Sequence, residues 1–229
     1  MVEVAPEVVE SLQVVPVARK AAQPQADRSL SDQAGPVSQQ LELVADEIRS
    51  CKKCELHGSR TNVVPGQGAS SPDIMFIGEA PGHDEDLQGL AFVGRAGKLL
   101  TKMIEAMGYT REEVFIGNIL KCRPPGNRAP YPHEMETCMP FLEAQIETLR
   151  PKVIIALGST AVKGLMQTTQ GITKLRGTWM SFCGIDLMPT YHPAYLLRNP
   201  AAKKDVWEDL KEVLRHLSRP VPPAKKGKS

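Results

Sequence analysis

The chain has 229 residues, of which 41% are hydrophobic and 24% are charged. These fractions are ordinary for a globular protein and allow one sizeable domain with a substantial core. No segment approaches the roughly 20 consecutive apolar residues of a membrane-spanning helix, which excludes an integral membrane protein. The N-terminus has no basic segment followed by an apolar one, so the sequence predicts no secretory signal and a cytoplasmic location.

The net charge of +2 is unevenly distributed along the chain. Residues 1–40 carry a net charge of −2, residues 219–229 carry +4, and residues 41–218 are formally neutral. The overall charge therefore gives no argument for nucleic-acid binding, and any such argument must come from local groups.

Composition divides the chain into three parts. Residues 1–37 contain no aromatic residue and have prolines scattered among Gln, Ala and Val, which predicts a disordered leader. Residues 38–218 are expected to form one folded domain. Residues 219–229 are expected to form a mobile basic tail.

Alternating strands and helices are predicted within the folded domain. The first helix has Ser38 as its N-cap and continues to Cys51. Strands separated by helices favour an α/β fold with a parallel sheet covered on both faces. The predicted strands cover residues 73–78, 114–120, 152–157 and 186–190, and the later helices cover 97–107, 134–149, 158–166 and 201–217.

Polar residues follow the predicted strands where ligands bind in such sheets, outside the carboxyl ends. The first strand is followed by Glu79, the second ends near Asn118, and the fourth is followed by His192. A carboxylate, an amide and an imidazole are therefore predicted to converge at one edge of the sheet. The alternative for each residue is an exposed strand end with no role in binding.

Four of the five cysteines form a candidate ligand set. Cys51 and Cys54 are a C-x2-C pair, and Cys122 and Cys138 follow at longer intervals. Four thiolates can bind a tetrahedral zinc ion or an iron–sulfur cluster, and the spacing alone does not separate the two. The alternative is that Cys122 and Cys138 are unrelated buried thiols. Cys183 lies in an apolar stretch and is expected to be an ordinary core cysteine.

The glycine-rich stretch 89–97 contains Phe92, one of only five phenylalanines. It lacks the Lys-Ser/Thr pair of a phosphate-binding loop and does not directly follow the first strand, so ATP and NAD binding are disfavoured. Phe92 is therefore either a core residue or a platform for a ligand.

Two further segments contain candidates for contact with a nucleic-acid backbone. Lys121, Arg123 and Arg128 lie in a basic loop and are candidates for phosphate contacts. Leu196 or Leu197, followed by Arg198, is a candidate wedge with a phosphate clamp. The alternative for both segments is a solvated loop or turn.

Five motifs, taken together, are shared with one protein family. They are GEAPG (78–82), GLAFVGRAG (89–97), NILKCRPPGNRAP (118–130), PKVIIALGSTA (151–161) and HPAYLLR (192–198). The sequence resembles the type-4 uracil-DNA glycosylases, iron–sulfur members of the uracil-DNA glycosylase superfamily. The similarity covers about residues 41–217 in unbroken order. Ala91 departs from the pattern, because the family commonly has proline before the aromatic residue.

The resemblance implies a three-layer α/β/α sandwich around a four-stranded parallel sheet. It implies an enzyme that hydrolyses the N-glycosidic bond of deoxyuridine in DNA, releasing uracil and leaving an abasic site for base-excision repair. It also implies a [4Fe-4S] cluster on the four cysteines of the candidate ligand set. We further expect a monomer in the prokaryotic cytosol, with the leader or tail available to a replication or repair partner.

Site roles carry over from the family one residue at a time. Glu79 matches the residue that assists the attacking water or the developing cation. His192 matches the histidine that stabilises charge on uracil O2. The other residues matched to uracil contacts are Gly78, Ala80, the stacking aromatic Phe92 and the edge-reading amide Asn118.

Two other functions remain open on the residues alone. One is a non-catalytic, cysteine-ligated DNA-binding module tethered by the leader to a replication or repair partner. Such a module has no need of Glu79, Asn118 and His192. The other is a zinc-stabilised phosphate-ester enzyme, which needs a second metal at the strand ends, and the sequence shows no Asp/His cluster to bind one.

Overall fold

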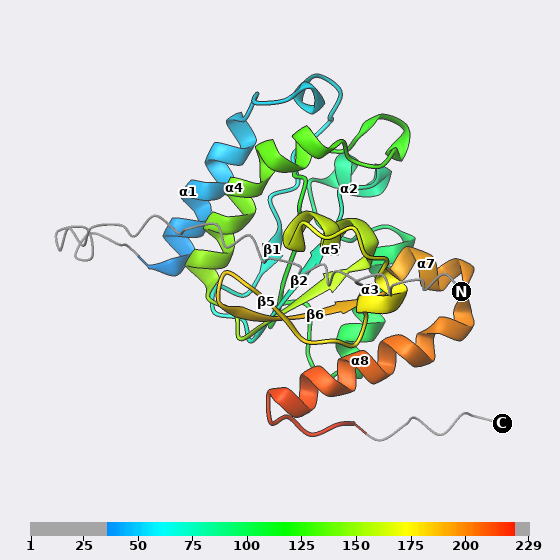
Figure 1. Ribbon diagram of the computed structural model, residues 1–229. Coiled ribbons are helices and arrows are strands. Elements are labelled where there is room, and N and C mark those ends of the chain that lie inside the picture. Colours follow the sequence, from blue (N-terminus) through cyan, green and yellow to red (C-terminus); the bar gives the residue numbers. More distant parts are fainter. Residues whose placement is uncertain (1–35, 223–229) are drawn as a thin grey trace, which may run out of the picture. The chain divides into compact units, whose positions relative to one another are not determined.

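The structure is a computed structural model that describes residues 36–222 (Figure 1). The predicted leader, residues 1–37, and the predicted tail, residues 219–229, therefore lie largely outside the described residues. Within the described range, no helix has the length and apolarity needed to cross a membrane.

A six-stranded sheet with the order β1-β3-β2-β4-β6-β5 forms the centre of the domain. Its four middle strands are parallel, as predicted from the sequence. Their bounds are β3 Phe115–Asn118, β2 Ile74–Gly78, β4 Val153–Leu157 and β6 Ile185–Thr190.

The two edge strands are antiparallel additions that the sequence analysis did not predict. β1 covers Gln67–Gly68 and β5 covers Met180–Phe182. Both are too short for an alternating pattern to be recognised, and they are stabilised by pairing with longer neighbours. The four-stranded parallel sheet is therefore the core of a larger mixed sheet.

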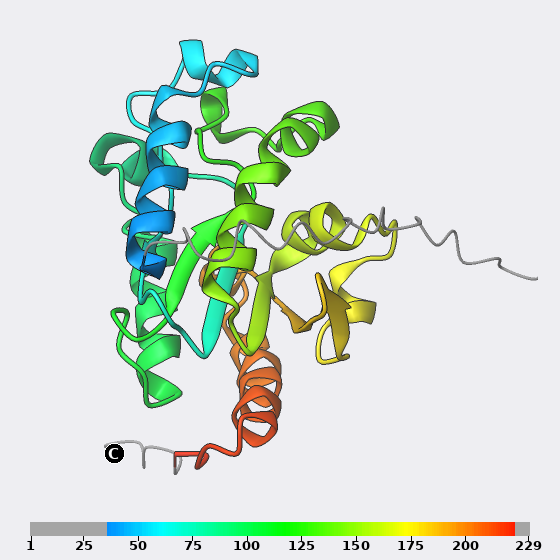
Figure 2. The same cartoon turned by 90° about the vertical axis from the view of Figure 1, so that its left-hand side faces the viewer.

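Alternating side chains of the middle strands supply two separate cores, one on each face of the sheet. Ile74 and Phe76 of β2 pack with α3 and α8, whereas Met75 and Ile77 pack with α4 and α5. Successive residues of a strand point to opposite faces, so a fully apolar strand needs cover on both sides. The result is the expected three-layer α/β/α arrangement (Figure 2).

Eight α-helices cover the sheet or connect its strands within the described residues. Helices α1 and α4 pack side by side in both views (Figures 1 and 2). The bounds are α1 Val37–Ser50, α2 His83–Gln88, α3 Arg95–Ala106, α4 Pro132–Leu149, α5 Gly158–Met166, α6 Ile172–Leu175, α7 Pro193–Arg198 and α8 Lys203–His216. Three short 3-10 helices cover Glu55–Gly58, Pro125–Asn127 and Pro200–Ala202.

Two local predictions are wrong. Ser38 is not the N-cap of the first helix, because that helix begins at Val37 and Pro36 occupies the N-cap position. Cys183 is not a core cysteine, because it is exposed and has a φ of 51°. It lies in the tight turn between β5 and β6, where a side chain cannot reach the sheet core.

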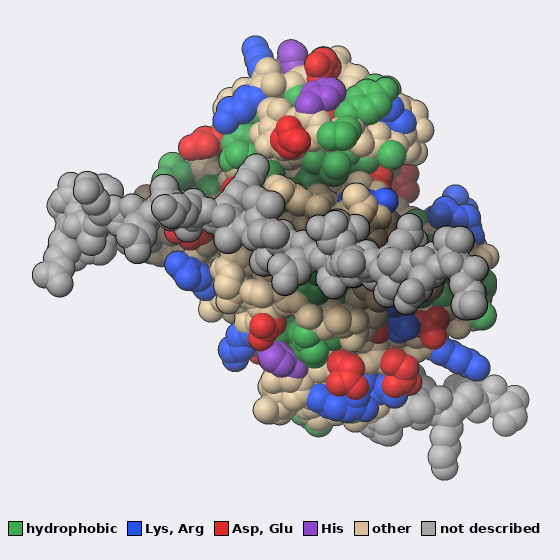
Figure 3. Space-filling model, in the orientation of Figure 1, with side chains coloured by type: hydrophobic (Ala, Val, Ile, Leu, Met, Phe, Trp, Pro, Cys, Tyr) green, Lys and Arg blue, Asp and Glu red, His purple; other side chains and the backbone are tan. Residues whose placement is uncertain are grey.

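Charged side chains of both signs are interspersed on the face drawn in Figure 3. The described residues visible in this view form no single basic surface of the kind that binds a nucleic-acid backbone by charge alone. The near-neutral charge of the folded part is consistent with this distribution.

Candidate active site

A cavity of about 520 Å³ opens at the carboxyl ends of the parallel strands. We call it the strand-end pocket. Among its lining residues are five that the sequence analysis had named as uracil contacts: Glu79, Ala80, Phe92, Asn118 and His192. The pocket lies where ligands bind in open parallel sheets, as expected.

Gly78 forms part of the tightly packed interior beneath this pocket. It pairs with Asn118 across β2 and β3. A Cβ at Gly78 would lie 2.4 Å from Asn118 Oδ1 and 2.5 Å from Phe92 Cζ. Both distances are shorter than any real carbon contact, so only glycine lets the amide and the ring approach this strand end.

Phe92 occupies a fixed position between two loops. Its side chain is 6% exposed and its φ is 53°, an uncommon backbone conformation for a non-glycine residue. A Cβ on Gly97 would lie 1.9 Å from the Phe92 carbonyl oxygen, so that glycine lets α3 pack directly against the loop. The Phe92 and His192 ring centroids are 5.7 Å apart.

Asn118 presents an unpaired acceptor in the pocket. The residue ends β3 and is 1% exposed. Its Oδ1 atom is buried and has no hydrogen-bond partner among the described residues. An unpaired buried acceptor is costly, which indicates that a ligand donates a hydrogen bond to it.

His192 is held as a neutral hydrogen-bond donor. Its Nδ1 accepts a hydrogen bond of 3.1 Å from the Ala194 backbone N–H, so the neutral ring carries its proton on Nε2. Burial, with a smaller contribution from the positive charge of Arg198, lowers the pKa of His192 from 6.5 to about 4. At neutral pH this ring therefore donates from Nε2 without carrying a charge.

The end of β6 fixes the segment that leads to His192. Thr190 Oγ1 donates a hydrogen bond of 2.6 Å to Asp209 Oδ2 of α8. Arg176 donates to the same carboxylate at 2.7 Å, and the Asp209 side chain is 2% exposed. A paired and hydrogen-bonded carboxylate is the form in which charge is tolerated in a core. The sequence analysis did not identify this network.

Glu79 lies at the pocket wall in the loop that follows β2 and is only partly exposed. Its backbone carbonyl accepts a 3.1 Å hydrogen bond from the Leu120 N–H. The neighbouring Glu85 connects two loops, because its carboxylate accepts bonds from the N–H groups of Gly82, Val93 and Gly94 at 2.9 to 3.1 Å. Glu85 was not identified from the sequence, although Glu three residues after an N-cap is a recognisable capping pattern.

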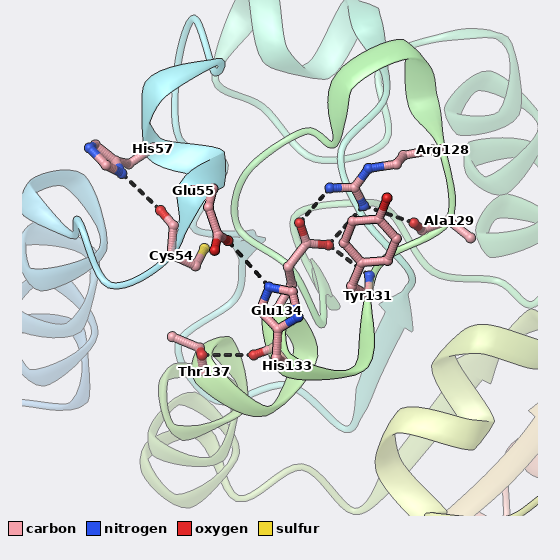
Figure 4. Close-up of polar contacts among 9 residues, drawn as sticks. All are labelled: Cys54, Glu55, His57, Arg128, Ala129, Tyr131, His133, Glu134 and Thr137. Carbon is pink, nitrogen blue, oxygen red and sulfur yellow. Dashed lines mark hydrogen bonds and ion pairs between the residues drawn. The ribbon is translucent and has the colours of Figure 1, made fainter.

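Both predicted phosphate-binding arginines have hydrogen-bond partners within the domain. Arg128 Nη1 and Nη2 bind the Glu134 carboxylate at 2.9 and 2.6 Å, and the guanidinium lies 3.7 Å from the Tyr131 ring centroid (Figure 4). Arg123 donates to Asn127 Oδ1 at 2.6 Å. Arg128 also lines the pocket, but its charge is neutralised by a buried carboxylate.

The leucine prediction is corrected in part. Leu196 is 1% exposed and packs in the core, so it cannot contact DNA in this conformation. Leu197 is 46% exposed, and Arg198 lines the strand-end pocket. Of the two candidate wedge residues, only Leu197 is accessible.

The four predicted ligand cysteines line one small cavity, which we call the cysteine site. Cys51 and Cys54 both follow the end of α1, Cys122 follows β3, and Cys138 lies on α4. Burial raises the pKa of Cys122 and raises that of Cys138 to about 11. Arg60 Nη1 lies 3.1 Å from Cys122 Sγ.

A second group with metal-ligating side chains lies beside the cysteine site. Ligand atoms of Glu55, His133 and Glu134 lie within 4.8 Å of one another. Glu134, however, already binds Arg128 and accepts a 2.7 Å hydrogen bond from the Tyr131 N–H (Figure 4). We therefore interpret this group as an ion-pair network, with His133 Nε2 3.2 Å from Glu55 Oε2.

Several known proteins similar to this chain share one activity in their names. The family model of the uracil DNA glycosylase superfamily matches residues 65–211. Type-4 uracil-DNA glycosylases from Saccharolobus solfataricus, Sulfurisphaera tokodaii and Thermotoga maritima are 49%, 47% and 46% identical in sequence to this chain. These alignments cover 76–78% of this chain and 87%, 83% and 95% of the respective relatives. The chain therefore belongs to the uracil-DNA glycosylase superfamily and, within it, to the type-4 uracil-DNA glycosylases.

Proposed function

We propose that this protein removes uracil from DNA by hydrolysing the bond between the base and deoxyribose C1′. The observation that carries the proposal is the unpaired Asn118 Oδ1 in a pocket that also contains a neutral His192. One group reads the base, and the other stabilises it as it leaves. The reaction leaves an abasic site, which is the starting point of base-excision repair.

Base reading is assigned to Asn118. Uracil carries a proton on N3 and an acceptor at O4, so an Asn amide accepts from N3–H and donates to O4. Cytosine has an acceptor at N3 and an amino donor at C4, which leaves the same amide with two unfavourable contacts. A base must leave the duplex to enter such a pocket, and Phe92 provides the apolar surface for stacking.

Leaving-group stabilisation is assigned to His192. When the C1′–N1 bond breaks, its electron pair remains on uracil, and negative charge develops on the ring and its oxygens. A neutral imidazole that donates from Nε2 stabilises this anion through a hydrogen bond at uracil O2. Since the ring is already neutral and fixed by Ala194, it needs no change of protonation state before the reaction.

Glu79 is assigned to the sugar side of the reaction. Bond cleavage leaves positive oxocarbenium character on C1′, which a nearby carboxylate stabilises. The same carboxylate orients the water that adds to C1′ and accepts its proton. Uracil then takes up a proton and leaves, so the hydrolysis is balanced without any redox step.

The cysteine site is proposed to hold a [4Fe-4S] cluster. Four thiol ligands and no carboxylate line the cavity, which matches the donor set of such clusters. The same four thiols would also suit a tetrahedral zinc ion. The resemblance to the type-4 uracil-DNA glycosylases, which are iron–sulfur proteins, favours the cluster, and its proposed contribution is structural.

We place the folded domain at residues 38–218 and expect a monomer that acts on uracil-containing DNA in the prokaryotic cytosol. We also assign the outer DNA contacts to Leu197 and Arg198, because both are exposed beside the pocket.

The experiment separates an enzyme from a DNA-binding module. Protein purified without oxygen is incubated with a uracil-containing oligonucleotide, which is then cleaved by alkali at abasic sites. We expect excision by the wild type, and losses of about 10²- to 10³-fold for Asn118→Ala and His192→Ala with DNA affinity retained. His216→Ala on the exposed side of α8 is the matched control. DNA binding without any strand scission would favour the module instead.

A further inference from the structure

Lys121 is a buried ammonium between the strand-end pocket and the cysteine site. The residue is 1% exposed and is among the largest fully buried side chains of the domain. Lysines are almost never fully buried without a charged partner, because an isolated ammonium is costly to remove from water. The phosphate contact predicted for Lys121 from the sequence is therefore wrong, because the ammonium lies inside the domain.

Two neutral oxygens hold the ammonium in place. Lys121 Nζ donates to the Asn118 backbone carbonyl at 2.9 Å and to Gln145 Oε1 at 2.7 Å. Gln145 Nε2 in turn donates to the Pro65 carbonyl at 2.8 Å, which fixes the orientation of the amide. The Lys121 carbonyl accepts a 2.8 Å bond from the Val64 N–H, so both ends of the residue are anchored.

The charge of Lys121 has no carboxylate partner in the described part of the chain. None of the ion pairs found there involves Lys121, and both of its hydrogen-bond acceptors are neutral oxygens. Lys121 also lines the cysteine site together with all four proposed ligands. Thiolates bound to metal are anionic, so a ligated cysteine site supplies the negative charge that the ammonium otherwise lacks.

We propose that Lys121 is a positioning residue that connects the two sites. Its ammonium fixes the Asn118 backbone, and so the amide that reads uracil, while its charge faces the cysteine thiolates and stabilises their ligated form. This inference rests on the proposed function of both sites. It predicts that one side chain governs metal retention and excision together, although it contacts neither uracil nor the sugar.

The test uses Lys121→Met, which keeps an unbranched side chain of similar length but removes the charge and both hydrogen bonds. Lys163→Met, at an exposed position of α5, is the matched control. Metal retention is measured as the half-time of visible absorbance loss under a chelator, and excision as the single-turnover rate at saturating DNA. We expect at least tenfold faster metal loss and at least tenfold slower excision in iron-replete Lys121→Met, with DNA affinity within threefold of wild type.

Wild-type metal retention or wild-type excision in iron-replete Lys121→Met would overturn the proposal. If this variant does not accumulate as folded protein, Gln145→Leu decides, because it leaves the charge but removes one of the two acceptors. It is expected to retain iron and to slow excision severalfold, and unchanged excision would overturn the positioning role. A wild-type protein that contains no iron would instead overturn the proposed cofactor and the role of Lys121 as its charge partner. The excision rates of the Lys121 and Gln145 variants would still test the positioning role.

Discussion

The segment 118–122 contributes Asn118 to the strand-end pocket and Lys121 and Cys122 to the cysteine site, but the two sites are held in place by different means. The pocket is formed at the ends of hydrogen-bonded strands, where Gly78 and Asn118 are register partners. The cysteine site is formed by three separate segments, and only Cys138 lies within a helix. The sheet backbone therefore sets the geometry of the pocket, whereas the cysteine site depends on what its side chains bind.

Protonation chemistry follows the same division. In the pocket, burial keeps His192 neutral, which is the form that the proposed reaction uses. In the cysteine site, burial raises the pKa of Cys54, Cys122 and Cys138. This favours the protonated thiol over the thiolate, which is the form that binds metal. We infer that the pocket already has the protonation state that the reaction needs before substrate binds. In the cysteine site, the free energy of metal binding must offset the cost of deprotonating the thiols.

The largest expected effect comes from Gly78→Ala, which tests whether the sheet sets the pocket. The added methyl group would collide with Asn118 Oδ1 and the Phe92 ring, so the base-reading amide must move. A displacement of about 1 Å in such a site costs on the order of 10²-fold in rate. We expect that loss in the single-turnover rate, with iron content unchanged.

Gly171→Ala is the matched control for this substitution. A Cβ at Gly171 has no atom within 4 Å, so excision should stay close to that of the wild type. Wild-type excision by Gly78→Ala would show that the close contact among Gly78, Asn118 and Phe92 does not limit the reaction.

The next effect in size separates the two kinds of cysteine. Cys138→Ser is expected to lose its iron and to lower Tm by about 5 °C or more, because metal binding contributes directly to folding. Cys183→Ser removes an exposed thiol and should change neither quantity. Iron is measured by colorimetric assay and Tm by circular dichroism. Equal iron content in the two variants would contradict the assignment of Cys138 as a ligand.

The same comparison explains which features the sequence could predict. Apolar runs such as Ile74–Gly78 identify a buried strand, and parallel strands place the following polar residues at one edge. The sequence alone therefore predicts that Glu79, Asn118 and His192 lie together. The C-x2-C pair likewise marked the first half of the cysteine site.

Features that depend on contacts between distant segments were not predictable. Lys121 is a basic residue in a polar loop motif, and only the packing of α4 shows that it is buried against Gln145. Arg128 was a candidate for phosphate contact because it lies in a basic loop, and its pairing with the buried Glu134 of α4 becomes visible only in the folded chain. Leu196 and Leu197 are adjacent and alike in the sequence, and the rotation of α7 alone decides which one is buried.

A smaller effect is expected from Arg128→Met, which removes the ion pair between Arg128, at the strand-end pocket, and the buried Glu134. Arg128 is the main cause of the lowered pKa of Glu134. A carboxylate with a lowered folded-state pKa stabilises the fold above its ordinary pKa of 4.5, and this contribution disappears as the pH falls through the folded value. We expect the variant to melt a few degrees below the wild type at neutral pH, with the difference shrinking below about pH 4.5.

Thermal melts of both proteins between pH 7 and pH 3.5 measure that difference. Arg95→Met, at an exposed position at the start of α3, is the control for loss of a positive charge. A Tm difference that stays constant down to pH 3.5 would show that the pairing with Glu134 is not the source of the stability.

The smallest effect concerns pH and tests whether the pocket is prepared before substrate arrives. His192 has a folded-state pKa of about 4, below its ordinary value of 6.5, so it remains neutral from pH 8 to about pH 5. We expect the single-turnover rate at saturating DNA to change less than twofold over that range on account of this group.

In the same range the unfolded chain takes up a proton that the folded one does not, so stability declines as the pH falls from 6.5 toward 4. Excision should thus hold steady while Tm drops, and His192→Gln should reduce that drop. A rate that falls tenfold between pH 7.5 and pH 5.5 with uptake of one proton, in protein that remains folded, would instead mean that His192 titrates near its ordinary pKa and that its burial does not keep it neutral.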